Sequence, residues 1–522
     1  MPVGESVIIS CPGKVLLAGG YLVLDRNHQG FVISTPSRFY TVVQEQEASS
    51  SRTDGSNDAS GEVGPVKLSV RSPQFDDGVW DYEATRRDGE WQVRQVDTQA
   101  PSNSFVHLSL QSTLRVATEL NPSAKIRDLL ITIVGSNDFY SQSRDDATPI
   151  PFAPLHCTIR NVHKTGLGSS AAMVTSLTSS LFLHWTAPGA TTDPSQPTVQ
   201  LMHNLAQYVH SLAQGKIGSG FDVSAAVYGS QVYRRFDVKC LGNLLETDKT
   251  ENTISSGGLL SVLSPAENPL WSSSDSSAAV SSFCLPPHLT LLLADVDAGS
   301  NTPSMVGKVL AWKKAQPEES ARVWDELSRT NERLSETFGE LRRASEVEHG
   351  DSYRQTVADL SRLRASEWSS TPPSSSASST RFSEAASTIL RVRELMRTMG
   401  EASDVPIEPP SQTKLLDAVS AIEGVVGAGV PGAGGYDAIW VLCLTPPSDA
   451  MSTTSERGPL EKVEALLTSW KEMSVRPLSR NAWVRGSESG TAGSERGLLR
   501  QTLEEVEGLR EAVERAKAQR IG

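Results

Sequence analysis

The hydrophobic pattern of the chain switches repeatedly between short apolar runs and segments with helical spacing, which predicts a mixed α+β protein. Runs rich in β-branched and aromatic residues predict strands. The expected strands are residues 7–11, 31–33, 39–43, 129–134, 231–236, 289–294 and 436–444. Apolar residues spaced by three or four predict helices. The expected helices are residues 105–120, 171–185, 199–212, 317–347, 352–363, 382–399, 411–423, 460–473 and 498–520.

Four segments interrupt this pattern because they contain few residues that a core can bury. Residues 47–65 predict a polar surface insertion, and residues 241–286 predict a Ser-rich insertion. Residues 366–380 are rich in Ser and Pro and are interpreted as a linker. Residues 481–522 are expected to form a flexible segment followed by a charged C-terminal helix. With 522 residues in all, the chain is long enough for two to four domains.

Composition and charge narrow the classes of function. The formal net charge is −13, so nucleic-acid binding through a global basic surface is not expected. The five cysteines are scattered and form no C-x-x-C pair, which argues against a disulfide framework or structural zinc and favours a reducing compartment. No apolar stretch approaches the length of a membrane span, and the start shows no signal-peptide pattern. We therefore expect a soluble cytoplasmic protein without membrane association.

The most informative stretch is Lys164-Thr-Gly-Leu-Gly-Ser-Ser-Ala-Ala-Met173. Its glycines allow a sharp turn, and Ser169 or Ser170 is expected to cap the helix that follows. The unpaired N–H groups and positive dipole end of such a helix favour a phosphate, and a serine hydroxyl there can ligate Mg²⁺. An ordinary Gly/Ser turn that caps an ordinary helix is the alternative interpretation. The residues expected to face inward from this helix are Ala171, Val174, Leu177, Leu181 and Trp185.

Two charged residues follow glycine-containing segments elsewhere in the chain. Lys14 comes after Pro12-Gly13, which is expected to form a turn, and precedes an apolar strand. Asp222 is expected on the first turn of a short helix that follows the glycine-rich segment 215–220. Taken alone, Lys14 is consistent with a solvated turn lysine, and Asp222 with a carboxylate that complements the helix dipole.

Several known motifs are absent or misplaced. The segment 427–433 matches a dinucleotide-binding fingerprint, but a helix is expected before it and a strand after it, the reverse of the required order. The chain has neither a Gly-x-x-x-x-Gly-Lys-Ser/Thr loop nor a His-Glu-x-x-His pair. His203 and His210 lie two helical turns apart and are expected to be at the surface or half-buried.

Three glycine-rich loops, in this order and with this content, resemble the motifs of the GHMP kinases. The first is Pro12-Gly-Lys-Val-Leu-Leu-Ala-Gly-Gly-Tyr21, the second is Gly166-Leu-Gly-Ser-Ser-Ala-Ala172, and the third is Gly432-Ala-Gly-Gly-Tyr-Asp437. The resemblance implies a two-domain α+β fold. It implies an N-terminal, ATP-binding domain similar to ribosomal protein S5 domain 2 at residues 1–240, and a ferredoxin-like C-terminal domain at residues 287–480.

Within the family, residues 215–222 and 300–306 look most like the fungal-type phosphomevalonate kinases. This resemblance implies Mg²⁺-dependent phosphoryl transfer from ATP to 5-phosphomevalonate in the mevalonate pathway to isoprenoids and sterols. Lys14 and Asp222 match the catalytic lysine and aspartate of the family. The second motif implies an ATP-phosphate loop of Lys164, Thr165, Gly166, Leu167, Gly168, Ser169, Ser170 and Ala171, with Ser170 as the metal ligand. The expected substrate contacts are Tyr21, Ser141, Lys216, Ser219, Gly434 and Gly435.

One departure from the family bears on the acceptor. The glutamate magnesium ligand of mevalonate kinases falls at Ser211 here, residues 199–221 contain no Asp or Glu, and Lys216 adds a positive charge. These changes favour the more anionic phosphomevalonate over mevalonate. Two alternatives stay open: mevalonate kinase or another small-molecule GHMP kinase, and a GHMP-fold sensor that binds nucleotide and metabolite without catalysis. Either a monomer or a homodimer is expected.

Overall fold

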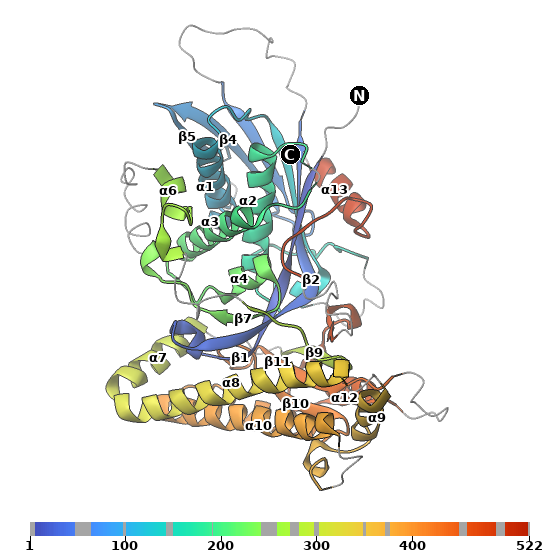
Figure 1. Ribbon diagram of the computed structural model, residues 1–522. Coiled ribbons are helices and arrows are strands. Elements are labelled where there is room, and N and C mark those ends of the chain that lie inside the picture. The colour runs from blue at the N-terminus through green and yellow to red at the C-terminus, as the bar shows by residue number, and fades with distance from the viewer. Residues whose placement is uncertain are drawn as a thin grey trace.

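The apolar runs of the sequence pair into two β-sheets, which are packed against helices (Figure 1). The computed structural model describes residues 6–46, 64–97, 101–141, 150–190, 192–241, 258–271, 281–296, 302–347, 351–370, 376–447, 457–486 and 496–519. None of the helices in these ranges has both the length and the apolar composition that a membrane crossing requires. The predicted insertion at residues 47–65 lies almost entirely outside the described residues.

The first sheet has nine strands in the described part of the chain and is built around two long antiparallel strands, β1 (Val7–Ala18) and β2 (Gln29–Glu45). Its order is β14-β1-β2-β6-β3-β4-β5, and β7 and β8 extend it beside β2. The other strands are β3 (Val66–Arg71), β4 (Val79–Arg87), β5 (Glu90–Gln95), β6 (Leu129–Gly135), β7 (Gln231–Arg234), β8 (Ser281–Ser282) and β14 (Leu499–Arg500). Asp88 and Gly89 form the hairpin turn between β4 and β5, where an Asp-Gly pair is a typical turn sequence.

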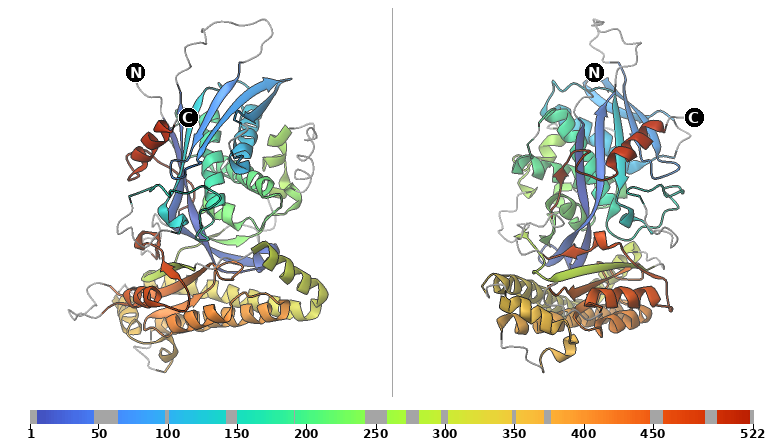
Figure 2. Two further views of the ribbon diagram at one scale, coloured as in Figure 1. Left: turned by 180° about the vertical axis from the view of Figure 1, so that it is seen from behind. Right: turned by 90° about the vertical axis from the view of Figure 1, so that its right-hand side faces the viewer.

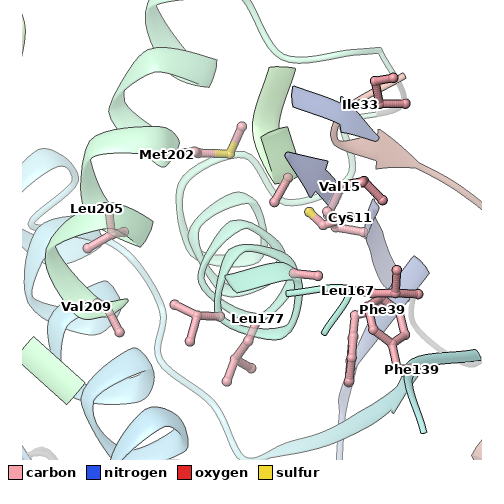
Figure 3. Packing of buried hydrophobic residues seen from close by; sticks show 14 of the residues in the cluster. Cys11, Val15, Ile33, Phe39, Phe139, Leu167, Leu177, Met202, Leu205 and Val209 are labelled. Carbon is pink, nitrogen blue, oxygen red and sulfur yellow. The ribbon is translucent and has the colours of Figure 1, made fainter. Parts of the chain in front are cut away.

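Four helices cover one face of this sheet: α1 (Ser104–Leu120), α2 (Ser169–Thr186), α3 (Gln196–Gln214) and α4 (Phe221–Tyr228) (Figure 1). All five α2 residues predicted to face inward are buried, which confirms that prediction. Met202, Leu205 and Val209 of α3 lie toward α2, near Leu177 (Figure 3). The helix with the phosphate-binding signature is thus the central helix of the layer, so its N-terminus has a fixed position.

The opposite face of the first sheet receives the C-terminal helix α13 (Leu509–Ala518), as the right-hand view of Figure 2 shows. Leu509 and Val513 of α13 pack with Tyr40 of β2 and Val134 of β6. The prediction of one helix over residues 498–520 is therefore wrong. Residues 499–500 form β14, which pairs with β1, because the backbone there satisfies the free edge of the sheet instead of its own helix.

The second sheet has the order β10-β11-β9-β12, with β13 also paired to β9. Its strands are β9 (Leu289–Val296), β10 (Val425–Gly429), β11 (Ala438–Leu444), β12 (Val475–Pro477) and β13 (Val484–Arg485). Its helices are α7 (Thr302–Ala315), α8 (Pro317–Val347), α9 (Asp351–Leu360), α10 (Ala377–Ser403), α11 (Pro410–Ser420) and α12 (Pro459–Ser469). With helices between β9 and β10 and α12 between β11 and β12, this is the ferredoxin-like β-α-β-β-α-β arrangement.

Five short helical segments complete the described elements: η1 (Leu22–Leu24), η2 (Asn137–Phe139), η3 (Pro269–Trp271), η5 (Ala365–Glu367) and η6 (Arg480–Ala482), with α6 (Gly258–Leu263) before η3. Part of the predicted Ser-rich insertion is therefore structured. Leu259, Leu263 and Trp271 are buried in the main hydrophobic cluster, since three apolar side chains suffice to dock this short segment. Residues 242–257 and 272–280 of that insertion lie outside the described residues.

Three further local expectations are corrected by the structure. Pro12-Gly13 forms no turn but a register irregularity inside β1, and the two strands expected at residues 31–33 and 39–43 are one strand, β2. Pro36 lies in this irregular part of β2, where it interrupts no ladder pairing. Residues 425–429 form β10, a strand that was not among those expected, because their glycines leave room for the side chains of Ile389 and Trp440.

The predicted linker at residues 366–380 also differs. Residues 377–380 are the first turn of α10, whose N-cap Ser376 accepts a hydrogen bond from the backbone N–H of Ser379. A serine-rich composition indicates a linker only where the hydroxyls have no structural partner, and here one of them caps a helix. Residues 371–375 lie outside the described residues.

A buried ion cluster fixes the segment between α10 and α11. The Arg393 guanidinium donates to both carboxylate oxygens of Glu408, at 2.7 and 3.0 Å, and Arg397 and Asp417 join the pair. Burial by itself raises the pKa of Glu408, but the hydrogen bonds and charges of Arg393 and Arg397 bring it below its ordinary value. The Glu408 side chain is fully buried, so its charge depends on these partners.

We expect Glu408→Gln to lower the free energy of unfolding by about 3 kcal/mol, because it leaves the buried Arg393 undercompensated. Urea denaturation at neutral pH measures the change. The matched control is Glu472→Gln, which removes an exposed pair with Lys414 and should change stability by less than about 1 kcal/mol. Because the folded pKa of Glu408 is lowered, its contribution is lost as the pH falls through that pKa. Equal denaturation midpoints for the two variants would contradict the assignment.

Candidate functional site

The phosphate loop (residues 164–170) is attached to β1 through Lys14. The backbone N–H of Lys14 donates to the carbonyl oxygen of Leu167 at 2.8 Å. Its Nζ donates to the carbonyl oxygen of Gly166 at 2.9 Å. The irregular register of β1 after Pro12 frees the Lys14 N–H from the sheet ladder and turns it toward the loop. Lys14 is therefore a half-buried residue of the loop's support and not a solvated turn lysine.

Close packing at two glycines allows this attachment. A Cβ on Gly13 would lie 3.0 Å from the Leu167 carbonyl oxygen, and a Cβ on Gly168 would lie 2.9 Å from Cε of Lys14. Gly168 also has φ +77°, a left-handed conformation that glycine adopts without strain. The side chain of Leu167 anchors the loop from below, since it is buried beside Phe39 and Phe139 (Figure 3).

The N-terminus of α2 has no side-chain cap. The N-cap residue is Gly168, and α2 begins at Ser169, so the expected capping role of Ser169 or Ser170 is wrong. A serine cap needs extended backbone at the cap residue, whereas this turn uses the left-handed conformation of glycine. The first N–H groups of α2 receive no side-chain acceptor at the cap and, with the helix dipole, favour an anion.

Beside this helix end lies a cavity of about 250 Å³ whose lining includes Lys164, Ser169 and Ser170. Its other walls are largely aromatic and apolar, and they include Phe39, Phe75, Trp80, Phe105, Tyr140, Ile159, Val162 and Met173. An apolar, aromatic cavity joined to an anion-binding helix end suits a flat base carrying phosphates. Thr165 is buried and holds the loop, because its hydroxyl donates to the Asp138 carbonyl oxygen at 2.6 Å.

Asp222 reaches the same region from the first turn of α4. Gly220, with φ +82°, is the N-cap of α4, and the next residue, Phe221, places its ring 5.5 Å from Nζ of Lys14. Burial lowers the pKa of Lys14, and the Asp222 carboxylate opposes that shift. One Asp222 oxygen accepts from the Val223 N–H at 3.0 Å, and the side chain is 24% exposed. The structure thus brings together the lysine, the carboxylate and the phosphate loop.

Residues of β7 and its C-terminal flank hold the loop before α4 in place. The Arg235 guanidinium donates to the carbonyl oxygens of Gly218 and Leu24, at 2.6 Å each, and the Tyr233 hydroxyl donates to that of Ser219 at 2.6 Å. Lys216 is exposed at the start of this loop. Lys216 and the half-buried Ser219 thus belong to one supported loop next to Asp222, and their substrate contacts stay predictions. The sequence signals did not single out Tyr233 or Arg235.

His210 is the main site residue that sequence reasoning missed. It is 3% exposed, not at the surface or half-buried as expected. Its Nε2 lies 3.1 Å from the Ser170 hydroxyl, and its Nδ1 lies 4.0 Å from an Asp222 carboxylate oxygen. The available signal was its position four residues after Ala206, which puts it on the buried face of the predicted helix.

The third glycine motif packs against the end of the first. A Cβ on Gly20 would lie 2.2 Å from the Gly432 carbonyl oxygen, and the Gly432 N–H donates to the Leu16 carbonyl oxygen at 3.2 Å. The buried Tyr21 hydroxyl donates to the Ala433 carbonyl oxygen at 2.8 Å. Through this hydrogen bond Tyr21 joins the first and third motifs. A contact between Tyr21 and the substrate remains a prediction.

Gly434 and Gly435 rest on the segment fixed by the buried ion cluster. The Gly435 N–H donates to the Ile407 carbonyl oxygen at 2.8 Å, and a Cβ on Gly434 would lie 2.2 Å from the same oxygen. Ile407 precedes Glu408, so the ion cluster supports the third motif directly. These contacts give Gly434 and Gly435 a structural role. Their binding of substrate stays a prediction.

Ser141 makes its contacts with other elements than Ser219 does. Its hydroxyl donates to the Asp295 carboxylate at 2.6 Å, and its N–H donates to the His163 carbonyl oxygen at 3.0 Å. It lines a second cavity, of about 760 Å³, between the first sheet, β12 and the segment before α13. The observed contacts therefore connect Ser141 with β9 and with the flank of the phosphate loop.

The donors near His210 fit a magnesium ion. The Ser170 hydroxyl and the Asp222 carboxylate supply oxygen, the ligand atom that Mg²⁺ prefers. In the described part of the chain, no group of three or more His, Cys, Asp or Glu residues is placed to hold a metal ion. This combination is typical of a Mg²⁺ that takes its remaining ligands from nucleotide phosphates and water.

Comparisons with known proteins show which sequences this chain resembles. A sequence profile described as the N-terminal domain of GHMP kinases matches residues 146–230, which include the phosphate loop, His210 and Asp222. The chain is 38% identical over 461 residues to the phosphomevalonate kinase of Aspergillus fumigatus, and the alignment covers 84% of this chain and 87% of that protein. It is 36% identical over 484 residues to a phosphomevalonate kinase of Arabidopsis thaliana named peroxisomal, covering 84% and 90%.

A solved structure shows the same fold. The phosphomevalonate kinase of Streptococcus pneumoniae, in complex with phosphomevalonate and AMPPNP, superposes with a TM-score of 0.52. The match covers 92% of this chain and 99% of that protein at 14% identity.

The contact between Gly168 and Lys14 yields a prediction. Gly168→Ala forces a methyl group against Cε of Lys14, which should displace the ammonium and weaken binding of a fluorescent ATP analogue by about tenfold, or about 1.4 kcal/mol. Gly89→Ala is the matched control: Gly89 has φ +87°, and a Cβ there meets nothing within 4 Å. Both variants should lose some thermal stability through backbone strain, but only the first should lose affinity. Unchanged binding in Gly168→Ala would refute the proposed contact.

Proposed function

Because this chain belongs to the phosphomevalonate kinases of the GHMP kinase family, we propose that it transfers the terminal phosphoryl group of ATP to 5-phosphomevalonate, giving 5-diphosphomevalonate and ADP. The observation that carries the proposal is the convergence of Lys14, Asp222 and the open N-terminus of α2 at one place. Phosphoryl transfer needs alignment and charge neutralisation more than covalent chemistry, and these groups supply both.

Each group has a distinct role in this proposal. The N-terminus of α2 and the backbone of residues 164–170 bind the ATP phosphates, and the aromatic cavity beside them takes the base. Lys14 neutralises charge on the transferring group. Asp222 orients the acceptor, whose phosphate oxygen is already largely ionised near neutral pH, so positioning outweighs proton removal.

Mg²⁺, when bound with ATP, neutralises phosphate charge during transfer. Ser170 would hold the Mg²⁺ ion. Asp222 would supply a carboxylate from the other side of His210. No carboxylate comes from α3, because Ser211 stands at the family's glutamate position.

The charge around the acceptor supports phosphomevalonate over mevalonate. Residues 199–221 carry Lys216 and no Asp or Glu. Arg235 lies just behind the same loop and bonds to backbone carbonyls, so its positive charge adds to that of Lys216. An acceptor with a phosphate and a carboxylate gains from this field, whereas mevalonate brings only the carboxylate.

The domain boundaries, the assembly and the location are part of the same proposal. Residues 1–240 would form the ATP-binding domain and residues 287–480 the ferredoxin-like domain, with the C-terminal segment returning to the first sheet through β14. A monomer or homodimer that binds no nucleic acid fits the net charge of −13. A cytoplasmic location is our expectation, while the Arabidopsis relative is named peroxisomal.

An assay of coupled ADP release tests the acceptor. We expect 5-phosphomevalonate to give a kcat/KM at least about a hundredfold above that of mevalonate, the scale of one well-placed charge contact of about 3 kcal/mol. Equal turnover of mevalonate would instead support a mevalonate kinase. Nucleotide binding without turnover of any acceptor would support a sensor.

The roles of Lys14 and Asp222 are tested by Lys14→Met and Asp222→Asn. Each should lower kcat by at least about a hundredfold, the scale of electrostatic and acid–base contributions, while circular dichroism shows the fold intact. Near-normal turnover in either variant would defeat the role assigned to that residue. Lys414→Met, at an exposed position on α11, controls for the loss of a positive charge.

A further inference from the structure

His210 stands between the two helix ends that form the site. The ring lies on α3, its Nε2 is 3.1 Å from the hydroxyl of Ser170 on α2, and its Nδ1 is 4.0 Å from the carboxylate of Asp222 on α4. The ring packs against Phe105 of α1, with centroids 5.9 Å apart. One buried imidazole therefore faces the proposed metal ligand on one side and the proposed acceptor-orienting carboxylate on the other.

The neighbouring amide assigns the ring tautomer. The side-chain nitrogen of Gln214 lies 3.1 Å from Nε2, and an amide nitrogen can only donate. With the amide in this orientation, Nε2 accepts and the ring proton sits on Nδ1, on the side of Asp222. Nε2 has one lone pair, so the Gln214 amide and the Ser170 hydroxyl share it, and the lone pairs of the hydroxyl face away from the ring. Those are the lone pairs a metal ion needs.

The other polar residues of this part of α3 are engaged elsewhere. The Ser211 hydroxyl, at the family's glutamate position, accepts a hydrogen bond from the Gln207 amide at 3.2 Å, and both residues are buried. His203 lies two helical turns earlier on the same helix. It forms a hydrogen bond with Asn204 and packs near Tyr228 and Trp271. In the described part of α3, His210 is thus the residue that lies between Ser170 and Asp222.

We propose that His210 is a positioning residue that sets Ser170 and Asp222 together: its Nε2 accepts the Ser170 hydroxyl hydrogen, and its Nδ1–H orients the Asp222 carboxylate. The proposal rests on the proposed function for the roles of those two residues. An imidazole here stands in place of a direct carboxylate ligand from α3 and acts on the metal site through Ser170. Such partners of metal ligands commonly change metal affinity or activity by about 10- to 100-fold, and hydrogen bonds in catalytic sites commonly shorten when substrates bind.

Three substitutions separate the two sides of the ring. His210→Phe keeps the packing with Phe105 and removes both the hydrogen bond to Ser170 and the N–H that faces Asp222. His210→Gln reaches the Nε2 position and retains a partner for Ser170. His210→Asn keeps an N–H near the Nδ1 position, toward Asp222. Because the last two are polar and shorter or more flexible, they keep the test informative if the Phe variant folds poorly.

Two measurements distinguish the Nε2 side of the ring, which faces Ser170, from the Nδ1 side, which faces Asp222. The first is calorimetric titration with ADP, with and without Mg²⁺ and in the absence of any acceptor. We expect the gain in ADP affinity from Mg²⁺ to fall about tenfold or more in His210→Phe and His210→Asn and to survive in His210→Gln. The second is kcat with 5-phosphomevalonate at saturating ATP and Mg²⁺. We expect a loss of about 10- to 100-fold in His210→Phe and His210→Gln, partial recovery in His210→Asn, and KM for 5-phosphomevalonate within about twofold of wild type.

His203→Phe is the matched control, since it changes a buried histidine of the same helix whose contacts are Asn204, Tyr228 and Trp271 and not the two site residues. It should lower the melting temperature and leave kcat and the Mg²⁺ effect unchanged. The proposal is overturned if His210→Phe matches wild type within about twofold in both measurements, or if all three variants behave alike, which would indicate packing alone. If the wild type does not phosphorylate 5-phosphomevalonate, the proposed function fails, while the ADP titration still decides the Ser170 side.

Discussion

Lys14 is bound to the phosphate loop by its backbone and its side chain at the same time, and the geometry of the site depends on this double attachment. The backbone N–H of Lys14 fixes Leu167 of the loop relative to β1. The Nζ group fixes the neighbouring Gly166 relative to the lysine side chain. Together they set the distance between the lysine and the N-terminus of α2. The constraint requires glycine at positions 13 and 168, because a Cβ at either place would occupy the space of the partner.

The same strand carries this constraint to the second sheet. After Lys14, β1 continues to Ala18 and ends in Gly19-Gly20-Tyr21, which packs on Gly432 and Ala433. One continuous strand therefore touches the second motif near its middle and the third motif at its end. A strand resists stretching, so a displacement of the ferredoxin-like part is transmitted to the lysine. The buried pair of Arg393 and Glu408 stiffens the far side of this connection, because it supports the Ile407 carbonyl on which Gly434 and Gly435 rest.

The elements that could be predicted from sequence are those whose cause is local. The apolar spacing of α2, the hairpin at Asp88-Gly89 and the left-handed glycines follow from neighbouring residues. The errors have long-range causes. β14 is a strand because β1 offers it an edge, and Pro12-Gly13 is an irregularity because the phosphate loop docks there. Within the candidate site, the resemblance to the GHMP kinases brought out Lys14 and Asp222. Arg235 and His210 bond to groups distant in sequence, which no pattern along the chain reveals.

The charge balance of the site accounts for the partners of Asp222 and Arg235. Asp222 faces an imidazole, and Arg235 bonds to backbone carbonyl oxygens. A carboxylate from α3 would pair with Lys14 or Lys216 and weaken the field that a polyanionic acceptor experiences. The chain instead supports Asp222 with an imidazole and binds Arg235 to the carbonyl oxygens of Gly218 and Leu24, so neither interaction cancels a positive charge. Asp222 remains the carboxylate that opposes the lowering of the Lys14 pKa by burial. Lys14 thus shares the site with the Asp222 carboxylate, and the positive charges of Lys216 and Arg235 are left for the two anionic substrates.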